Sequence, residues 1–204
     1  MPWSRMRPCG AITSASEGCL RLWPPFENPT FSHAPLKQHH ITLSVNGQEH
    51  PLTLTRAAKL LQILRNDLHL NGPRYGCGLG QCGACTVLID DRAARACVIP
   101  AVELDGRTIT TLEGLAARGQ PHPVQQAFID AQAAQCGYCL NGMIMTTVAL
   151  LRSNPNPSER DIREALAGNL CRCGTHLEIL EAVQRAVRSH GVEVRASAMA
   201  QVAG

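Results

Sequence analysis

Eight of the ten cysteines in this 204-residue chain fall into two groups of four, and this grouping limits the possible folds more than any other feature. The first group has the spacing C-x4-C-x2-C-x11-C and consists of Cys77, Cys82, Cys85 and Cys97. The second has the spacing C-x2-C-x31-C-x1-C and consists of Cys136, Cys139, Cys171 and Cys173. If the four thiols of a group converge on one centre, the chain must bring distant segments together around it.

The spacing of the first group is typical of plant-type [2Fe–2S] ferredoxins, in which a loop wraps the cluster and a more distant strand supplies the fourth thiolate. Four glycines surround these cysteines: Gly76, Gly78, Gly80 and Gly83. Glycine permits unusual dihedral angles and lets backbone N–H groups point at sulfur. Zinc would also take four thiolates, but zinc sites usually pair their ligands through two short knuckles. The glycine-rich loop therefore favours the cluster.

The second group is less specific by itself. Cys136 and Cys139 precede one predicted helix, and Cys171 and Cys173 precede another. The positive ends of both helix dipoles would then point at an anionic centre. Iron–sulfur and zinc centres both fit this pattern, and a redox disulfide between Cys136 and Cys139 is a third alternative. The first group in the same chain favours iron–sulfur.

Composition and charge exclude several classes of protein. The net charge of +3 is too small to indicate nucleic-acid binding, and no apolar stretch is long enough to span a membrane. No signal peptide is recognisable, so we expect a cytoplasmic protein whose thiols stay reduced and bind metal. No nucleophile and base stand out as a pair, so we expect no catalytic residues in this chain. The chain would then do no bond chemistry itself.

The sequence divides into four segments. Residues 1–38 contain six prolines and no periodic pattern, which predicts a disordered leader or a start assigned too far upstream. Residues 39–115 predict a small mixed sheet with one helix. Residues 116–190 predict a helical domain, and residues 191–204 a disordered tail. Cys9 and Cys19 lie in the leader and are expected to be spare thiols.

Local patterns place the elements. The expected strands are an alternating run from Ile41 to Val45, a second through Leu52 and Leu54 after the Asn46-Gly47 turn, and later strands at 86–90, 98–99 and 107–110. Leucines at 60, 61, 64 and 68 predict one helix within the sheet domain. Further helices are expected along the apolar stripes of 124–131, 140–151 and 179–187, and after the N-cap residue Ser158.

Three segments resemble the iron–sulfur subunits of molybdenum hydroxylases, the xanthine dehydrogenase superfamily. They are Gly76–Val87, Gln135–Cys139 and Gly168–Gly174. The resemblance implies an α+β fold in which a β-grasp plant-type ferredoxin domain precedes an all-α four-helix [2Fe–2S]-binding domain. It implies two [2Fe–2S] clusters, and a contact from Gln135 to a molybdopterin cofactor held by a large partner subunit. For Gln135, a helix-capping role is the alternative.

Within this superfamily, the segments 71–76, 122–130 and 173–179 are most similar to the small subunits of nicotinate dehydrogenases. The resemblance implies hydroxylation of nicotinate or a related N-heteroaromatic, with electrons leaving through a cytochrome c or an FAD-containing subunit. Iron–sulfur subunits of isoquinoline 1-oxidoreductases and aldehyde dehydrogenases are alternatives. A structural zinc-binding interaction protein and a free-standing electron carrier are alternatives of other classes.

Overall fold

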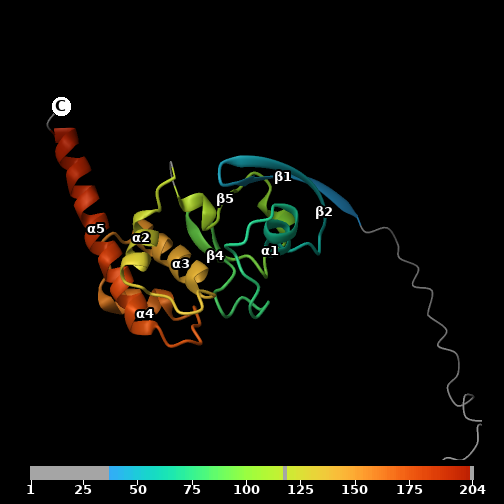
Figure 1. The fold of residues 1–204 in the computed structure, drawn as a ribbon. Coiled ribbons are helices and arrows are strands. Elements are labelled where there is room, and N and C mark those ends of the chain that lie inside the picture. Colours follow the sequence, from blue (N-terminus) through green and yellow to red (C-terminus); the bar gives the residue numbers. More distant parts are fainter. Residues whose placement is uncertain (1–36, 117–118, 203–204) are drawn as a thin grey trace, which may run out of the picture. The chain divides into compact units, whose positions relative to one another are not determined.

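The computed structural model describes residues 37–116 and 119–202. In this part of the chain a five-stranded mixed sheet is followed by a group of helices, which confirms the expected order (Figure 1). The strands are β1 (Gln38–Val45), β2 (Gln48–Thr55), β3 (Thr86–Ile89), β4 (Arg92–Arg95) and β5 (Thr108–Thr110). The helices are α1 (Leu60–Gln62), α2 (Pro123–Asp130), α3 (Leu140–Ser153), α4 (Glu159–Leu166) and α5 (His176–Val202). Shorter helical turns are η1 (Ile63–Asp67), η2 (Ala101–Leu104) and η3 (Glu113–Leu115).

Two hairpins form most of the sheet, whose strand order is β2-β1-β5-β3-β4. Strands β1 and β2 are antiparallel, and Asn46 and Gly47 both have positive φ angles in the turn between them, as predicted. The second hairpin joins β3 and β4 through Asp90 and Asp91, which also have positive φ angles. Strand β5 lies between the hairpins, parallel to β1 and antiparallel to β3.

The structure departs from the predicted strands at β4 and in the residues that follow it. Strand β4 was not predicted, because its sequence Arg-Ala-Ala-Arg lacks the β-branched and aromatic residues that favour strands. The strand predicted at 98–99 is wrong: the Val98 N–H donates to the Arg95 carbonyl at 3.2 Å, so the chain turns there. Pro100 then forms only an isolated bridge with Lys59, since proline has no N–H with which to extend a ladder.

The sheet core lies between the strands and the first helix. Ile41, Leu43 and Val45 alternate along β1 and are buried, which confirms the predicted strand. The predicted leucine helix is present as α1 continued by η1, a π-helical turn, and it buries Leu60 and Leu64 completely. These side chains belong to one cluster with Val87, Ile109, Cys85 and Cys97.

The helices form a second core. Helix α3 is buried along most of its length, from Asn141 to Val148, because α2, α4 and α5 all contact it. Strand β3 separates the two cores: Val87 packs into the sheet core and Leu88 into the helical core. All four residues of β3 are therefore buried.

The ends of the helices follow from their capping residues. Ser158 caps α4 as predicted: its side chain accepts from the Asp161 N–H, and the Asp161 side chain accepts from the Ser158 N–H. Helix α5 continues to Val202 and so includes residues 191–202, for which the sequence analysis expects a disordered tail; this stretch contains no proline to stop a helix. None of the helices in the described residues is both long and apolar enough to cross a membrane.

The leader predicted for residues 1–38 lies outside the described residues, except for Lys37 and Gln38. Gln38 begins β1 and pairs with Thr55 at the far end of the first hairpin. The division at residue 115 between a sheet domain and a helical domain stays a prediction.

The Ser158 cap provides a test of helix α4. We expect Ser158→Ala to lower the free energy of unfolding by about 1 kcal/mol, because the Asp161 N–H at the helix start loses its side-chain acceptor. Chemical denaturation followed by circular dichroism measures the change. Ser189→Ala, on the exposed side of α5, is the control and should leave the stability within about 0.5 kcal/mol. Equal effects of the two substitutions would contradict the capping role.

Candidate functional site

The loop before β3 wraps around the sulfur of Cys77. The backbone N–H groups of Leu79 and Gln81 each donate to Cys77 Sγ at 3.3 Å, and that of Cys82 does so at 3.4 Å. Further N–H groups donate from Cys77 to Cys82 Sγ and from Gly80 to Cys97 Sγ, both at 3.3 Å. The loop therefore presents positive N–H dipoles to the sulfurs, as expected for a negatively charged centre.

Two glycines make this conformation possible. Gly78 and Gly80 have φ angles of 69° and 73°, in the left-handed region that side chains with a Cβ rarely adopt. Gly76 contributes through close approach instead, because a Cβ at this position would lie 2.6 Å from Cys82 Sγ. Three of the four glycines predicted to matter, Gly76, Gly78 and Gly80, are thus required by the path of the loop.

The first four cysteines lie together in two pairs. Cys77 and Cys82 are within hydrogen-bonding reach of each other in the loop, and Cys85 and Cys97 are within reach of each other where β3 begins and β4 ends. The N–H groups of Leu79 and Cys82 hold the pKa of Cys77 down at about 6. Burial raises the pKa of Cys85 to about 12. The site therefore combines an outer thiol that ionises readily with an inner one that stays protonated until a cation binds.

The second group lies at the beginnings of α3 and α5. Cys139 is the N-cap of α3 and lies within hydrogen-bonding reach of Cys171, while Cys136 lies within reach of Cys173. The segment with Cys136 and Cys139 thus meets the segment with Cys171 and Cys173, more than thirty residues later, and forms two cysteine pairs with it. This agrees with the prediction that the two helix starts point at one centre.

The second group also combines thiols whose pKa is raised, Cys139 and Cys173, with thiols whose pKa is lowered, Cys136 and Cys171. Burial, together with the adjacent sulfur of Cys171, raises the pKa of Cys139 to about 12. Burial acts to raise the pKa of Cys171 too, but hydrogen bonds from the hydroxyl and N–H of Thr175 and from the N–H of Cys173 outweigh it and lower the pKa to about 6. The Cys171 Sγ and Thr175 Oγ1 atoms are 3.4 Å apart.

These arrangements fit a binuclear cluster. Each iron of a [2Fe–2S] cluster takes two thiolates, and each group supplies two close pairs. Among the described residues, no group of three or more His, Cys, Asp or Glu side chains is gathered closely enough to hold a single metal ion. The eight cysteines of the two groups form no disulfides, and Cys136 is paired with Cys173 rather than with Cys139. This pairing does not fit the redox disulfide that the sequence left open.

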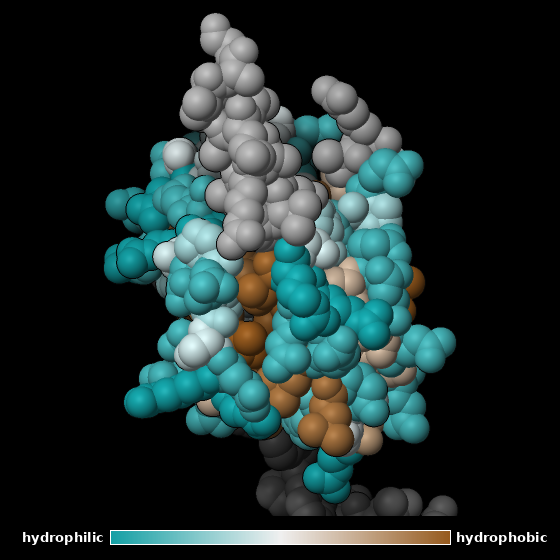
Figure 2. Space-filling model, turned by 90° about the vertical axis from the view of Figure 1, so that its left-hand side faces the viewer, coloured by the Kyte–Doolittle hydropathy of each residue, from teal (hydrophilic) through white to brown (hydrophobic). Residues whose placement is uncertain are grey.

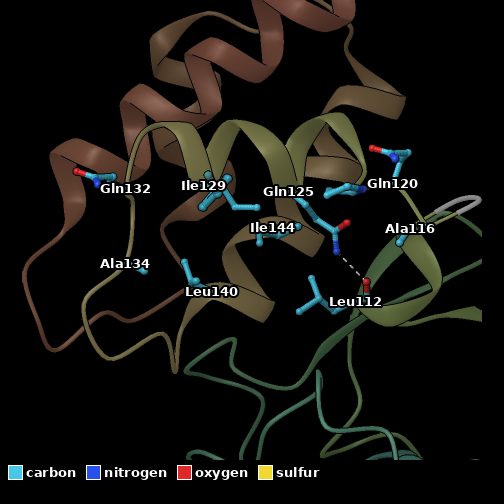
Figure 3. Close-up of a pocket in the computed structure, with 12 residues that line it drawn as sticks. Leu112, Ala116, Gln120, Gln125, Ile129, Gln132, Ala134, Leu140 and Ile144 are labelled. Carbon is cyan, nitrogen blue, oxygen red and sulfur yellow. Dashed lines mark hydrogen bonds between the residues drawn. The ribbon is translucent and has the colours of Figure 1, made fainter.

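Gln135 is exposed just before the second group. Beside it, an apolar pocket of about 550 Å³ lies between the start of α3, helix α2 and the chain near η3. In Figure 3 the side chains of Ile129, Ile144 and Leu140 line this pocket, and Gln125 donates to the Leu112 carbonyl. Figure 2 shows apolar side chains exposed in a hollow between hydrophilic ones on the helical side of the molecule.

Cys9 and Cys19 lie outside the described residues.

Sequence reasoning missed three polar residues that connect the two groups. Arg95 and Asn169 hydrogen-bond to each other at 3.1 Å. Asn141, in the first turn of α3, is buried and donates to the carbonyls of Ala84 and Thr86 beside the first group, both at 2.9 Å. Only the tertiary structure brings these residues together, so no local pattern could have identified them.

Comparisons with known proteins agree with this geometry. Residues 43–112 match the family model of the 2Fe-2S iron-sulfur cluster binding domain, and residues 111–184 match that of the [2Fe-2S] binding domain. One subunit of the nicotinate dehydrogenase of Pseudomonas putida is 64% identical over 152 residues, which are 74% of this chain and 97% of that protein. The alpha subunit of isoquinoline 1-oxidoreductase from Brevundimonas diminuta is 46% identical over 151 residues, 72% of this chain and 97% of that protein.

Solved structures give the same result. A chain of quinoline 2-oxidoreductase from Pseudomonas putida superposes with a TM-score of 0.71 and 34% identity, covering 75% of this chain and 96% of that chain. Aldehyde oxidoreductase from Desulfovibrio gigas gives a TM-score of 0.72 and 37% identity over 76% of this chain, but the match covers only 17% of that much longer chain.

The two matched domains define an electron-transfer protein with two [2Fe–2S] clusters. More narrowly, the chain belongs to the family of small iron–sulfur subunits of molybdenum hydroxylases, which includes the nicotinate dehydrogenase subunit of Pseudomonas putida.

Gly76 allows the first site to be disturbed selectively. We expect Gly76→Ala to remove the first cluster and leave the second, because the new Cβ would displace the Cys82 sulfur, 2.6 Å away. Electron paramagnetic resonance of the reduced protein would then show one [2Fe–2S] signal in place of two. Gly106→Ala is the control for backbone strain alone: its φ of 72° disfavours alanine, but no atom lies within 4 Å of the new Cβ, so both signals should be kept. Retention of both signals in Gly76→Ala would contradict this account of the loop.

Proposed function

We propose that this chain is the electron-transfer subunit of a molybdenum hydroxylase and passes electrons singly to an external acceptor from a molybdopterin centre in a partner subunit. The observation that carries the proposal is the presence of two sites of paired thiols within one packed unit. Both family models that match the chain are iron–sulfur cluster binding domains, so the role that we propose for the chain is to hold and insulate redox centres.

Cys77, Cys82, Cys85 and Cys97 would hold the first cluster, and Cys136, Cys139, Cys171 and Cys173 the second. When bound, each [2Fe–2S] cluster accepts and returns one electron. Backbone N–H groups donate hydrogen bonds to the sulfurs of Cys77, Cys82 and Cys97, and these bonds stabilise added negative charge at the first site. Burial of Cys85 beside the sheet core keeps water away from its inner side.

The molybdopterin contact is assigned to Gln135. Its exposure just before Cys136 leaves its side chain accessible to a partner, and the adjacent apolar pocket is large enough to receive side chains from that partner. In the aldehyde oxidoreductase of Desulfovibrio gigas, a region similar to this chain is part of a much longer polypeptide. A large partner subunit would take the place of the remainder of that polypeptide. A cytochrome c or an FAD-containing subunit would receive the electrons.

The finer description of the fold belongs to the same proposal. We assign residues 39–115 to a β-grasp ferredoxin domain, because the β1–β2 hairpin pairs with β5 in parallel and α1 covers the sheet core. We assign residues 116–190 to an all-α domain of four helices, supported by the cluster of buried side chains that α2 to α5 share.

Nicotinate, or a related N-heteroaromatic, is the substrate class that we propose for the complete complex. Support comes from the 64% identity with the nicotinate dehydrogenase subunit of Pseudomonas putida and the 46% identity with an isoquinoline 1-oxidoreductase subunit. Aldehydes are the second candidate, since an aldehyde oxidoreductase iron-sulfur-binding subunit of Escherichia coli is 42% identical over 161 residues.

Metal analysis tests the cofactor assignment. We expect about four irons and about four acid-labile sulfides in each chain, with negligible zinc, because two complete four-cysteine sites are present. Cys82→Ser should halve both contents and leave the second cluster's paramagnetic signal in place. A colourless protein with stoichiometric zinc would contradict the proposal.

The function itself is tested on the complex with its large subunit. We expect turnover of nicotinate with an artificial electron acceptor, and no turnover by the isolated chain, because the proposed molybdopterin centre lies in the partner subunit. Gln135→Ala should slow the reduction of the clusters by substrate while both clusters stay assembled, because the contact to the pterin is lost. Gln126→Ala is the control, because Gln126 is an exposed glutamine on α2 that does not line the apolar pocket. Turnover of aldehydes alone would overturn the nicotinate assignment, and turnover by the isolated chain would overturn the subunit role.

A further inference from the structure

A backbone hydrogen bond joins the segments that carry the two cysteine sites. The Leu170 N–H donates to the Cys82 carbonyl at 3.0 Å. Cys82 belongs to the first site, and Leu170 directly precedes Cys171 of the second. A continuous path therefore runs from the Cys82 sulfur to the Cys171 sulfur through covalent bonds and one hydrogen bond, with no through-space jump.

The guanidinium of Arg95 holds this junction together. It donates to the Gly83 carbonyl at 3.4 Å, directly after Cys82, and to the Gly168 carbonyl at 3.0 Å on the other side. It also donates to the Asn169 side chain at 3.1 Å and to the Thr86 hydroxyl. The planar, multidentate guanidinium suits this bridging role in a way that a lysine ammonium would not.

Close packing leaves the junction little freedom. A Cβ on Gly83 would lie 2.1 Å from the Asn169 Oδ1 atom, and a Cβ on Gly142 would lie 2.3 Å from the Gly83 carbonyl oxygen. The Asn169 side chain is buried and donates onward to Thr146 in α3 at 3.1 Å. The loops of the two sites are therefore packed against each other and against α3.

No carboxylate in the described part of the chain forms an ion pair with Arg95. Its hydrogen-bond partners are carbonyl, amide and hydroxyl oxygens, and the ion pairs found in the described residues all involve other arginines. A fixed positive charge between two centres that become more negative on reduction favours their reduced states.

We propose that electrons pass between the two sites through the Cys82 carbonyl and the Leu170 N–H, and that Arg95 is the positioning residue that keeps this contact formed. The inference rests on the proposed electron-transfer function. In each step one electron leaves the second site, which is oxidised, and arrives at the first, which is reduced. No covalent bond is made or broken.

The test uses the full chain carrying both clusters. One electron is introduced by flash photoreduction, and the rate at which the two paramagnetic signals reach equilibrium is followed by rapid freezing. We expect Arg95→Met to keep both clusters and to slow this rate by roughly tenfold or more, with a fall in the cluster potentials. Arg95→Lys retains the charge but not the planar guanidinium, so it should restore the potentials without restoring the rate.

Arg92→Met is the matched control, because Arg92 lies exposed at the other end of β4. An equilibration rate in Arg95→Met equal to that of Arg92→Met would overturn the proposal. If Arg95→Met loses a cluster, the deciding measurement is the equilibration rate of Asn169→Ala. This substitution removes one acceptor that holds the Arg95 guanidinium and leaves the charge of Arg95 in place. Slower equilibration in Asn169→Ala supports the route; an unchanged rate, or loss of a cluster there too, overturns it. Failure of the proposed function is distinct, because the unmodified chain would then lack two [2Fe–2S] signals.

Discussion

The conformation of the sheet half depends on the hydrogen bonds that the chain donates to the sulfur of Cys77. Backbone N–H groups from Leu79, Gln81 and Cys82 all point at this atom. N–H groups used in this way cannot take part in a strand ladder, so the segment between η1 and β3 must be a loop. The loop then delivers Cys85 to the start of β3, and the β3–β4 hairpin returns the chain so that Cys97 meets Cys85.

Residues with a local signal could be predicted from the sequence. Cysteine spacing identified the two groups, and alternation identified β1, whose inward residues are Leu43 and Val45. Strand β4 has no such signal, because its two alanines and two arginines acquire strand geometry only by pairing with β3. Arg95 was missed for the same reason: its partners Gly168 and Asn169 are more than seventy residues away in sequence. Periodicity describes burial, and it does not describe long-range polar contacts.

Each site combines thiols of opposite tendency, and this bears on how metal is taken up. Hydrogen bonds lower the pKa of Cys77 and of Cys171 to about 6, so both are largely thiolates at neutral pH. Burial raises the pKa of Cys85 and of Cys139 to about 12, so both remain protonated without a cation. At neutral pH, metal binding therefore releases few protons from Cys77 and Cys171. The inner thiols lose their protons as the metal's charge offsets the cost of burying a thiolate.

Strand β3 explains why the two family domains behave as one packed unit. Val87 faces the sheet core and Leu88 the helical core, so a movement of one half relative to the other would expose a side chain that is now fully buried. Asn141 of α3 adds a polar constraint at the same place, since it donates to the carbonyls on both sides of Cys85. A hinge between the domains would make the separation of the two redox sites variable, and transfer between them would become irregular. Packing around β3 removes that freedom and holds the Leu170 N–H and the Cys82 carbonyl together at 3.0 Å.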